Sequence, residues 1–498
     1  MDFFQNVLLG FQVALQPGNL LFCFVGVLIG TLVGVLPGLG PVAAISLLLP
    51  TTFHITPVSA VIMLAGIYYG AMYGGSTTSI LVNIPGEAAS VVTCLDGYQM
   101  ARQGRAGPAL GIAAFGSFIA GTLAVLGLMF VAPPLAEMAL KFGPPEYFSL
   151  MIVGLTILTF LASGPMWKAL LMACFGLFLG CMGMDSIMGT TRFTWDIVEL
   201  SEGFGLVPVV MGLFGVSEVL LNVEQTLERS IFETRIQNLF PTRKDWRDSI
   251  GAILRGSAIG FFLGILPGGG ATISAFTAYA VEKRVSRHSE KFGTGVIEGV
   301  AAPESANNAA TGGAFIPLLT LGIPTSATMA ILLGALVIYG TQPGPMLIKE
   351  HPNLFWGVVA SMYLGNFMLL VLNLPLIGLW VKVLKIPYPI LFPLILLFCL
   401  IGAYSLNNNI AQILFMIGFG FLGYLFKKFK YEAAPLVLAF VLGPMLEKAL
   451  RRSLLHSGGD PGIFLTRPIS ALLLAIALAL LIFPLIPRLT KKRPAFGD

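Results

Sequence analysis

The sequence EGVAAPESANNAATGGAFIPLLTLGIPTS, residues 298–326, combines features that are costly in an apolar chain. It holds two carboxylates, Glu298 and Glu304, the adjacent amides Asn307 and Asn308, and three prolines. Polar side chains and helix breakers are unfavourable in hydrocarbon unless protein or a water-filled cavity surrounds them. Apolar segments flank the stretch, and it contains no Lys or Arg. We therefore interpret it as a polar, broken functional segment within the membrane; a solvent-exposed loop is the alternative.

The composition of the whole chain indicates a polytopic membrane protein. Hydrophobic residues make up 56% of the 498 residues and charged residues only 11%, against about 25% charged in soluble domains. Apolar segments of roughly 20 residues predict an all-α fold with about 11–13 membrane crossings. The net charge of +5 comes from loops, and no basic face with interleaved aromatic residues indicates nucleic acid; the expected surroundings are a lipid bilayer.

Two motifs recur in the two halves of the chain. GVLIGTLVGVLPGLG, residues 26–40, matches GSAIGFFLGILPGGG, residues 256–270, at every glycine of the first motif and at its proline. GGSTTSILVNIPGEAAS, residues 74–90, resembles GGAFIPLLTLGIPTSATM, residues 312–329, in a Gly-Gly pair followed by Ile-Pro. Glycines four residues apart suit close helix packing, which is the purely structural alternative for that part. The LPGxG and IP elements predict two structural repeats, each with broken helices or re-entrant hairpins.

The charges predict how the halves are arranged. Residues 1–222 form a first transmembrane half, residues 223–250 a cytoplasmic linker with an interfacial amphipathic helix, and residues 251–498 a second half. Basic loops predict cytoplasmic positions, and the acidic loop 185–205 an external one, which favours repeats of opposite orientation. Arg451, Arg452 and Arg467 do not fit this pattern, so the topology of the N-terminus and of the part after Lys430 stays open.

Repeated halves with discontinuous helices indicate a secondary transporter. Helix N-termini with free N–H groups suit an anionic substrate, and no arginine falls inside the motifs. If residues 304–308 are helical, Glu304, Asn307 and Asn308 share one face; they could hold Na⁺ or a proton, or form an internally hydrogen-bonded clamp. Glu87 and Glu298 are weaker candidates, because each can reach an interface. The predicted substrate- and ion-binding residues are Gly38, Gly40, Ser76, Thr77, Thr78, Asn83, Pro85, Gly86, Gly268, Gly269, Gly270, Thr272, Glu304, Asn307, Asn308, Thr311, Gly312, Gly313, Pro324, Thr325 and Ser326.

Sequence signatures of catalysis are absent from the chain. It has no HExxH, no G-x-G-D aspartyl motif and no P-loop. The five cysteines are scattered, so neither a disulfide framework nor a metal site is expected. We predict no enzyme, no catalytic residue, no resident metal and no cofactor, with Na⁺ or H⁺ as the coupling ion. An ion channel and a non-transporting membrane scaffold are the alternative classes.

The same residues resemble a known family. EGVAAPESANNAATGGAFIPLLTLGIPTSATMAILLGAL closely resembles the signature of the large membrane subunit of bacterial tripartite tricarboxylate transporters, and so do GVLPGLGPVAAISLLLP and YYGAMYGGSTTSILVNIPGEAASVVTCLDGYQMARQGRAGPAL. One departure is Thr325, where the family pattern has glycine. The resemblance implies a bacterial cytoplasmic (inner) membrane protein with a small four-helix membrane subunit and a periplasmic solute-binding protein as partners. It further implies import of carboxylates such as citrate, driven by an ion gradient, Na⁺ above all, with an elevator motion.

Overall fold

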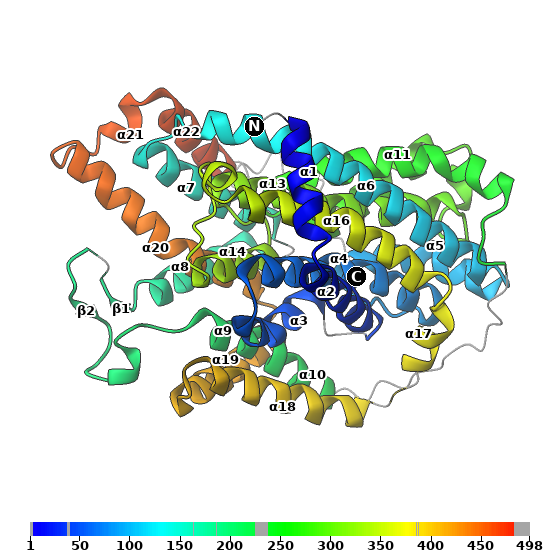
Figure 1. Ribbon diagram of the computed structural model, residues 1–498, viewed down its shortest axis with the longest axis horizontal. Coiled ribbons are helices and arrows are strands. Elements are labelled where there is room, and N and C mark those ends of the chain that lie inside the picture. The colour runs from blue at the N-terminus through cyan, green and yellow to red at the C-terminus, as the bar shows by residue number, and fades with distance from the viewer. Residues whose placement is uncertain are drawn as a thin grey trace. The chain divides into compact units, whose positions relative to one another are not determined.

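The computed structural model of the protein describes residues 3–36, 40–162, 164–185, 187–224, 238–384, 386 and 388–482. This part of the chain is almost entirely helical, with one two-stranded hairpin, and nine of its helices are long and apolar enough to cross a membrane (Figure 1). Five shorter apolar helices accompany them. The predicted class, an all-α polytopic membrane protein, is confirmed.

The chain divides into two compact units, each built from segments of both sequence halves. The first unit comprises residues 1–137 and 205–428, and the second residues 138–204 and 429–498. The predicted division at residues 223–250 stays a prediction, and most of that segment lies outside the described residues. The helices of the first unit are α1 (Phe3–Ala14), α2 (Pro17–Val35), α3 (Gly40–Leu48), η1 (Leu49–His54), α4 (Pro57–Val82), η2 (Ala88–Ser90), α5 (Val91–Arg102), α6 (Ala106–Ala139), α9 (Leu206–Val210), η4 (Met211–Val216), α10 (Ser217–Glu224), α11 (Arg243–Ile265), α12 (Gly270–Val285), η5 (Ser289–Lys291), α13 (Glu298–Leu321), α14 (Ala327–Ile338), α15 (Leu347–Glu350), α16 (Pro352–Asn373), α17 (Ile377–Val383), α18 (Tyr388–Asn407) and α19 (Ile410–Lys428).

Two helices, α4 and α13, form the centre of the first unit. Every residue of α13 except Leu321 is buried, and so is nearly all of α4. A helix that is buried on all sides is apolar all round or satisfies its polar groups internally. The polar residues of α13 therefore lie in the core of the unit, and the alternative of a solvent-exposed loop at residues 298–326 is wrong.

Glycines of the repeated motif set the packing of two helix pairs. A Cβ at Gly30 on α2 would lie 2.5 Å from the carbonyl oxygen of Ile67 on α4. A Cβ at Gly260 on α11 would lie 2.2 Å from the carbonyl oxygen of Ala306 on α13. The glycines one turn before and one turn after make the same kind of approach in both pairs. Only glycine permits backbones this close, so the four-residue spacing fixes α2 against α4 and α11 against α13.

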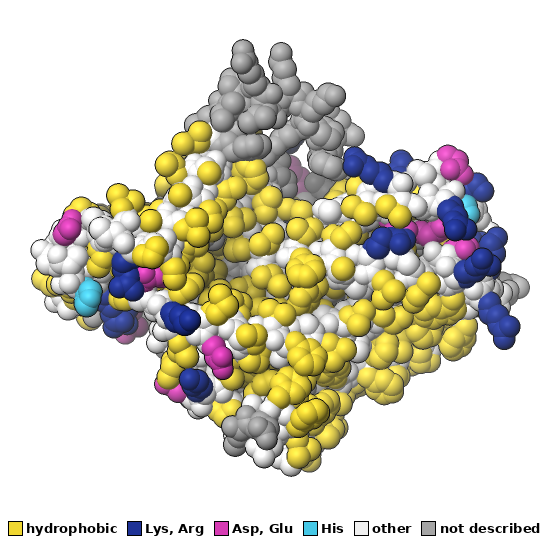
Figure 2. All heavy atoms as spheres, turned by 90° about the horizontal axis from the view of Figure 1, so that it is seen from above, with side chains coloured by type: hydrophobic (Ala, Val, Ile, Leu, Met, Phe, Trp, Pro, Cys, Tyr) yellow, Lys and Arg dark blue, Asp and Glu magenta, His cyan; other side chains and the backbone are white. Residues whose placement is uncertain are grey.

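The surface of the molecule fits a membrane environment. Figure 2 shows apolar side chains over much of one face, and Lys and Arg gathered on the side where Figure 1 labels α5 and α11. On α19, Leu414 and Phe421 are more than half exposed. Large apolar side chains exposed in such numbers are rare on soluble monomers and normal on lipid-facing helices.

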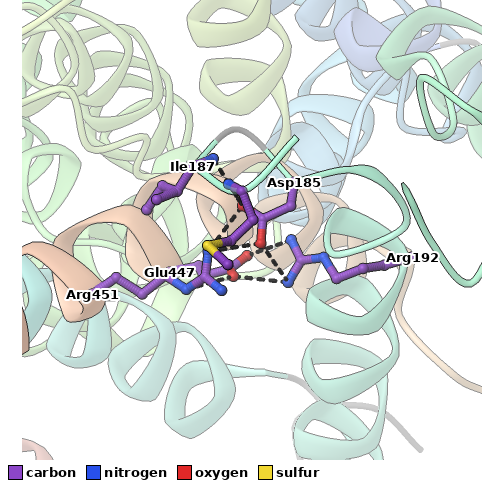
Figure 3. Close-up of polar contacts among 6 residues, drawn as sticks. Asp185, Ile187, Arg192, Glu447 and Arg451 are labelled. Carbon is purple, nitrogen blue, oxygen red and sulfur yellow. Dashed lines mark hydrogen bonds and ion pairs between the residues drawn. The ribbon is translucent and has the colours of Figure 1, made fainter. Parts of the chain in front are cut away.

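The second unit comprises α7 (Pro144–Leu161), α8 (Met166–Gly180), β1 (Gly183–Met184), β2 (Thr191–Arg192), η3 (Val198–Leu200), α20 (Ala433–His456), α21 (Ile463–Thr466) and α22 (Pro468–Ile482). Asp185, only 3% exposed, follows β1 and is held by Arg451 of α20 at 2.7 Å (Figure 3). Backbone N–H groups, that of Ile187 above all, and Arg451 lower the pKa of Asp185 to about 2. Arg467 likewise pairs with Glu146 at 2.6 Å. Two of the three arginines that fitted the charge rule badly, Arg451 and Arg467, are thus partners of acidic groups, and their charge carries little orientation signal.

The structure corrects where the helices of the first unit break. Gly312 and Gly313 lie inside α13, and the matching Gly-Gly pair lies inside α4. Each pair packs against a neighbouring backbone or side chain; a Cβ at Gly313 would lie 2.4 Å from the carbonyl oxygen of Phe261. Two prolines also lie within α13, at residues 303 and 317. The chain leaves helical geometry only after Val82 and after Leu321, so the part from Glu298 to Leu321, which the sequence indicated as broken, is one continuous helix.

Candidate functional site

The two breaks share one backbone course. Asn83 ends α4 with φ 57° and ψ 28°, and Gly322 ends α13 with φ 69° and ψ 27°. Both angles lie in the left-handed region, which glycine and asparagine tolerate best. An Ile-Pro pair and one further residue then lead to a helix cap, Glu87 at φ −146° and ψ 167°, or Ser326 at φ −151° and ψ 169°. In both halves, a new helix therefore begins shortly after the left-handed residue that ends the previous helix.

The caps differ in charge. The Oε2 atom of Glu87 accepts a hydrogen bond from the backbone N–H of Ala89 at 2.6 Å, at the start of η2 and α5. The Oγ atom of Ser326 accepts from the N–H of Met329 at 3.3 Å, at the start of α14. A carboxylate offsets the partial positive charge of a helix N-terminus, and a hydroxyl leaves most of it uncompensated. Glu87 was a weaker candidate from sequence because its position can reach an interface, but its side chain is buried.

Glu304 is the most enclosed acidic group of the site, with none of its side chain exposed. Its two carboxylate oxygens accept hydrogen bonds from Ser76 of α4 and Thr93 of α5. Asp96 fixes α5 in place, because it accepts from the backbone N–H groups of Gly295 and Val296 just before α13. Three elements therefore converge on one carboxylate.

The two amides of α13 point to different partners. Asn307 donates to Oε1 of Glu87 at 3.2 Å, and Asn308 donates to Oγ of Ser117 on α6 at 2.7 Å. Neither amide is bonded to the carboxylate of Glu304, although Asn308 also donates to its backbone oxygen. The alternative in which Asn307 and Asn308 hold the Glu304 carboxylate within one helix is therefore wrong. The amide oxygens of both asparagines are buried and have no hydrogen-bond partner.

In the second half, the break after α13 is tied to the glycine loop between α11 and α12. The backbone N–H of Gly268 donates to the carbonyl oxygen of Thr325 at 2.8 Å. The side chain of Thr325 is fully buried, and its hydroxyl has no partner. Gly270 begins α12 with φ 46°, as Gly40 begins α3 with φ 52°. The residues just before α12 and just before α14 are thus joined by a direct backbone contact.

Other predicted residues are used for local structure. Thr78 donates to the carbonyl oxygen of Val35 at 2.9 Å, at the end of α2, and Thr311 donates to that of Asn308. Gly269 packs against the carbonyl oxygen of Leu263. Pro85 and Pro324 shape the breaks, Gly86 lies beside Gly34, Thr272 lies in the first turn of α12, and Gly38 falls outside the described residues.

Basic side chains do not contribute to this network. Within the part of the chain that the structure describes, neither Glu304 nor Glu87 forms an ion pair. A buried carboxylate without a positive partner takes up a proton or a cation. The arrangement therefore offers helix N-termini for an anion and acidic groups for a cation within one unit.

Comparison with known proteins identifies the chain. The profile described as the tripartite tricarboxylate transporter TctA family matches residues 20–438, which include both breaks. The chain belongs to the TctA family. Membership makes it a multi-pass membrane subunit of a tricarboxylate transporter and confirms the resemblance. The tripartite family implies a small membrane subunit and a periplasmic binding protein as further components.

Two relatives of this TctA-family chain come from Agrobacterium vitis. One, an uncharacterized 52.8 kDa protein in the TAR-I ttuC' 3' region, is 53% identical over 493 residues, 99% of this chain and 98% of the relative. The other, an uncharacterized protein in the TAR-II ttuC' 3' region, is 53% identical over 234 residues, 47% of this chain and 97% of the relative. No solved structure matches the chain.

Thr93 and Ser117, two residues of the network, were missed by sequence reasoning. Each lies on a helix without a repeated motif, and each donates to or accepts from α13 across the core. No spacing pattern marks them, because their role depends on which helices pack against α13. Only the polar character of the α13 face could have indicated that partners were needed.

Proposed function

We propose that this subunit carries carboxylates of the citrate type across the bacterial inner membrane, driven by an ion gradient. A periplasmic solute-binding protein delivers the substrate, and a small four-helix membrane subunit completes the complex. The observation that carries the proposal is the pairing of two matching helix breaks with two buried carboxylates that lack basic partners among the described residues. The family supplies the substrate class.

The anion would bind at the second break. The first turns of α12 and α14 present N–H groups and partial positive charge where Gly268 contacts Thr325. Ser326 is a neutral cap, so an arriving carboxylate meets no opposing charge from it. The coupling cation would bind near Glu304 and Glu87, and an elevator motion of the part that carries the breaks would move both ions together.

The test is transport in proteoliposomes that contain this subunit with its small partner. Labelled citrate and a panel of mono-, di- and tricarboxylates are offered with and without the binding protein, under an imposed Na⁺ or H⁺ gradient. Uptake that needs the binding protein and one gradient supports the proposal and identifies the ion. Ion flux without solute would instead indicate a channel, and a folded complex that moves no carboxylate would indicate a scaffold.

The substitution Glu304→Gln tests the site itself. It removes a charge and leaves one of the hydroxyl donors, Ser76 or Thr93, facing an amide nitrogen, so we expect gradient-driven uptake to fall by at least about tenfold. Glu298→Gln is the matched control, because Glu298 lies on the same helix but pairs with His288 at 2.8 Å, outside the network. Equal uptake by wild type and Glu304→Gln would remove Glu304 from the mechanism.

A further inference from the structure

A small polar cavity lies beside the carboxylate network in the first unit. Its oxygen-bearing lining comes from Tyr73, Ser76 and Thr77 of α4, Ser117 of α6 and Asn373 at the end of α16. Apolar residues of α6 complete the wall. The cavity has a volume of about 10 Å³, which is room for one water-sized group. Tyr73, Ser117 and Asn373 are not among the residues that the sequence analysis selected.

Three of these lining groups have oxygen lone pairs that are available to accept. The amide nitrogen of Asn373 donates to the carbonyl oxygen of Leu369 at 2.9 Å, and its buried oxygen has no partner among the described residues. The hydroxyl of Tyr73 donates its hydrogen to Asn366 at 2.5 Å, and that of Ser76 donates to the carboxylate group of Glu304. The hydrogens are committed elsewhere, and acceptor oxygens remain.

The groups around the cavity make its electrostatic potential negative, which favours a cation. Asn373 is the last residue of α16, a helix of 22 residues, and a helix C-terminus carries partial negative charge. Ser76 connects the cavity directly to the carboxylate of Glu304. A neutral water offers two hydrogens, fewer than the acceptors present, and leaves the negative charge in place. A cation satisfies the acceptors and balances the charge.

We propose that this cavity is a binding site for a small monovalent cation, Na⁺, with Asn373, Ser76, Tyr73 and Ser117 as its oxygen ligands. Hard oxygen ligands without a carboxylate in direct contact suit Na⁺ better than a divalent ion. Room for one water-sized group favours Na⁺ and Li⁺ over K⁺. The cation site itself is argued from the cavity. Only the role of Na⁺ as the ion whose gradient drives uptake rests on the proposed function.

Thermal unfolding of the purified complex with its small subunit tests the site without transport. Na⁺, Li⁺, K⁺ and choline chloride are compared at one ionic strength and without carboxylate. A ligand that binds only the folded state stabilises it by mass action, so we expect Na⁺ to raise the Tm of the wild type above its value in K⁺ or choline. Tyr73→Phe and Asn373→Leu should each raise the Na⁺ concentration for half the shift by at least about tenfold, because each removes one ligand.

Gln412→Leu is the matched control. Gln412 on α19 also has a buried amide oxygen without a partner, but it does not line the cavity. It should keep the full Na⁺ response. A wild type that responds equally to Na⁺ and choline, or a Na⁺ response that survives in both cavity variants, would overturn the proposal. A rise in Tm with Na⁺ but no carboxylate uptake would support the cation site and count against the proposed function. Carboxylate uptake driven by H⁺ without any rise in Tm with Na⁺ would support the proposed function and count against the cation site.

Discussion

The break after α4 and the break after α13 follow the same path but carry opposite chemistry. Both pass through a left-handed residue and an Ile-Pro pair into an extended cap residue. The first break is capped by the carboxylate of Glu87, and the second by the hydroxyl of Ser326. The first helix N-terminus is therefore already neutralised, and the second is open to an anion. One backbone path can therefore end in a charged or in a neutral cap through a single changed residue.

The residue before the cap differs as well. A Cβ at Gly86 would lie 2.0 Å from the carbonyl oxygen of Gly34 and 2.6 Å from Cα of Gly75. Thr325 occupies the matching place in the second break with a complete side chain, fully buried. The first break is thus locked against α2 by contact between backbones. The second has space for a side chain whose hydroxyl is unused.

The largest expected effect comes from Gly86→Ala. The added methyl group meets backbone atoms that have no room to move, so we expect a loss of stability of about 3 kcal/mol or more and little folded protein. Yield after size-exclusion chromatography and the Tm of any purified complex measure this. Gly418→Ala on α19 is the control, since nothing lies within 4 Å of its Cβ. A stable, active Gly86→Ala would show that the first break is not locked.

Ser326→Glu should make the second break resemble the first. Glutamate can cap α14 as serine does, so the fold should persist, but its charge opposes a carboxylate at that N-terminus. We expect the KM for citrate uptake to rise by at least about tenfold. Ser326→Gln has the same size without the charge and should have a much smaller effect. If both variants raise KM equally, bulk rather than charge is responsible, and the assignment of the anion to this break is wrong.

The sequence was sufficient for the parts of the site that depend on local pattern. Glycine spacing predicted closely packed helix pairs, and the Ile-Pro motifs predicted breaks. Glu304 was selected because a carboxylate in an apolar membrane segment is costly and is usually kept for function. The stretch 298–326 was predicted to be broken, but it is helical as far as Leu321, because its Gly-Gly pair packs closely inside the helix. Here Gly313 meets the backbone at Phe261. Tertiary packing overrode local propensity.

Contacts between distant helices could not be predicted. Thr93 and Ser117 reach α13 from α5 and α6, and Asn373 reaches the small cavity from the end of α16. None has a neighbour in sequence that hints at its partner. Arg451 is a similar case, since its pairing with Asp185 joins residues that a charge count treats as unrelated. These roles follow from which helices pack together, and a single sequence does not encode that in any local spacing.

Thr325→Val is the smallest change and separates fold from function at the second break. The hydroxyl is buried without a partner, so its removal should leave stability unchanged or raise it by about 1 kcal/mol. If the hydroxyl instead meets the substrate, the KM for citrate should rise several-fold at constant Tm, because a site built to hydrogen-bond a ligand loses that bond. A fall in Tm would mean that the hydroxyl is bonded in the folded protein. An unchanged KM would place the anion at the free N–H groups of α12 and α14 alone, since those N–H groups are untouched by the substitution.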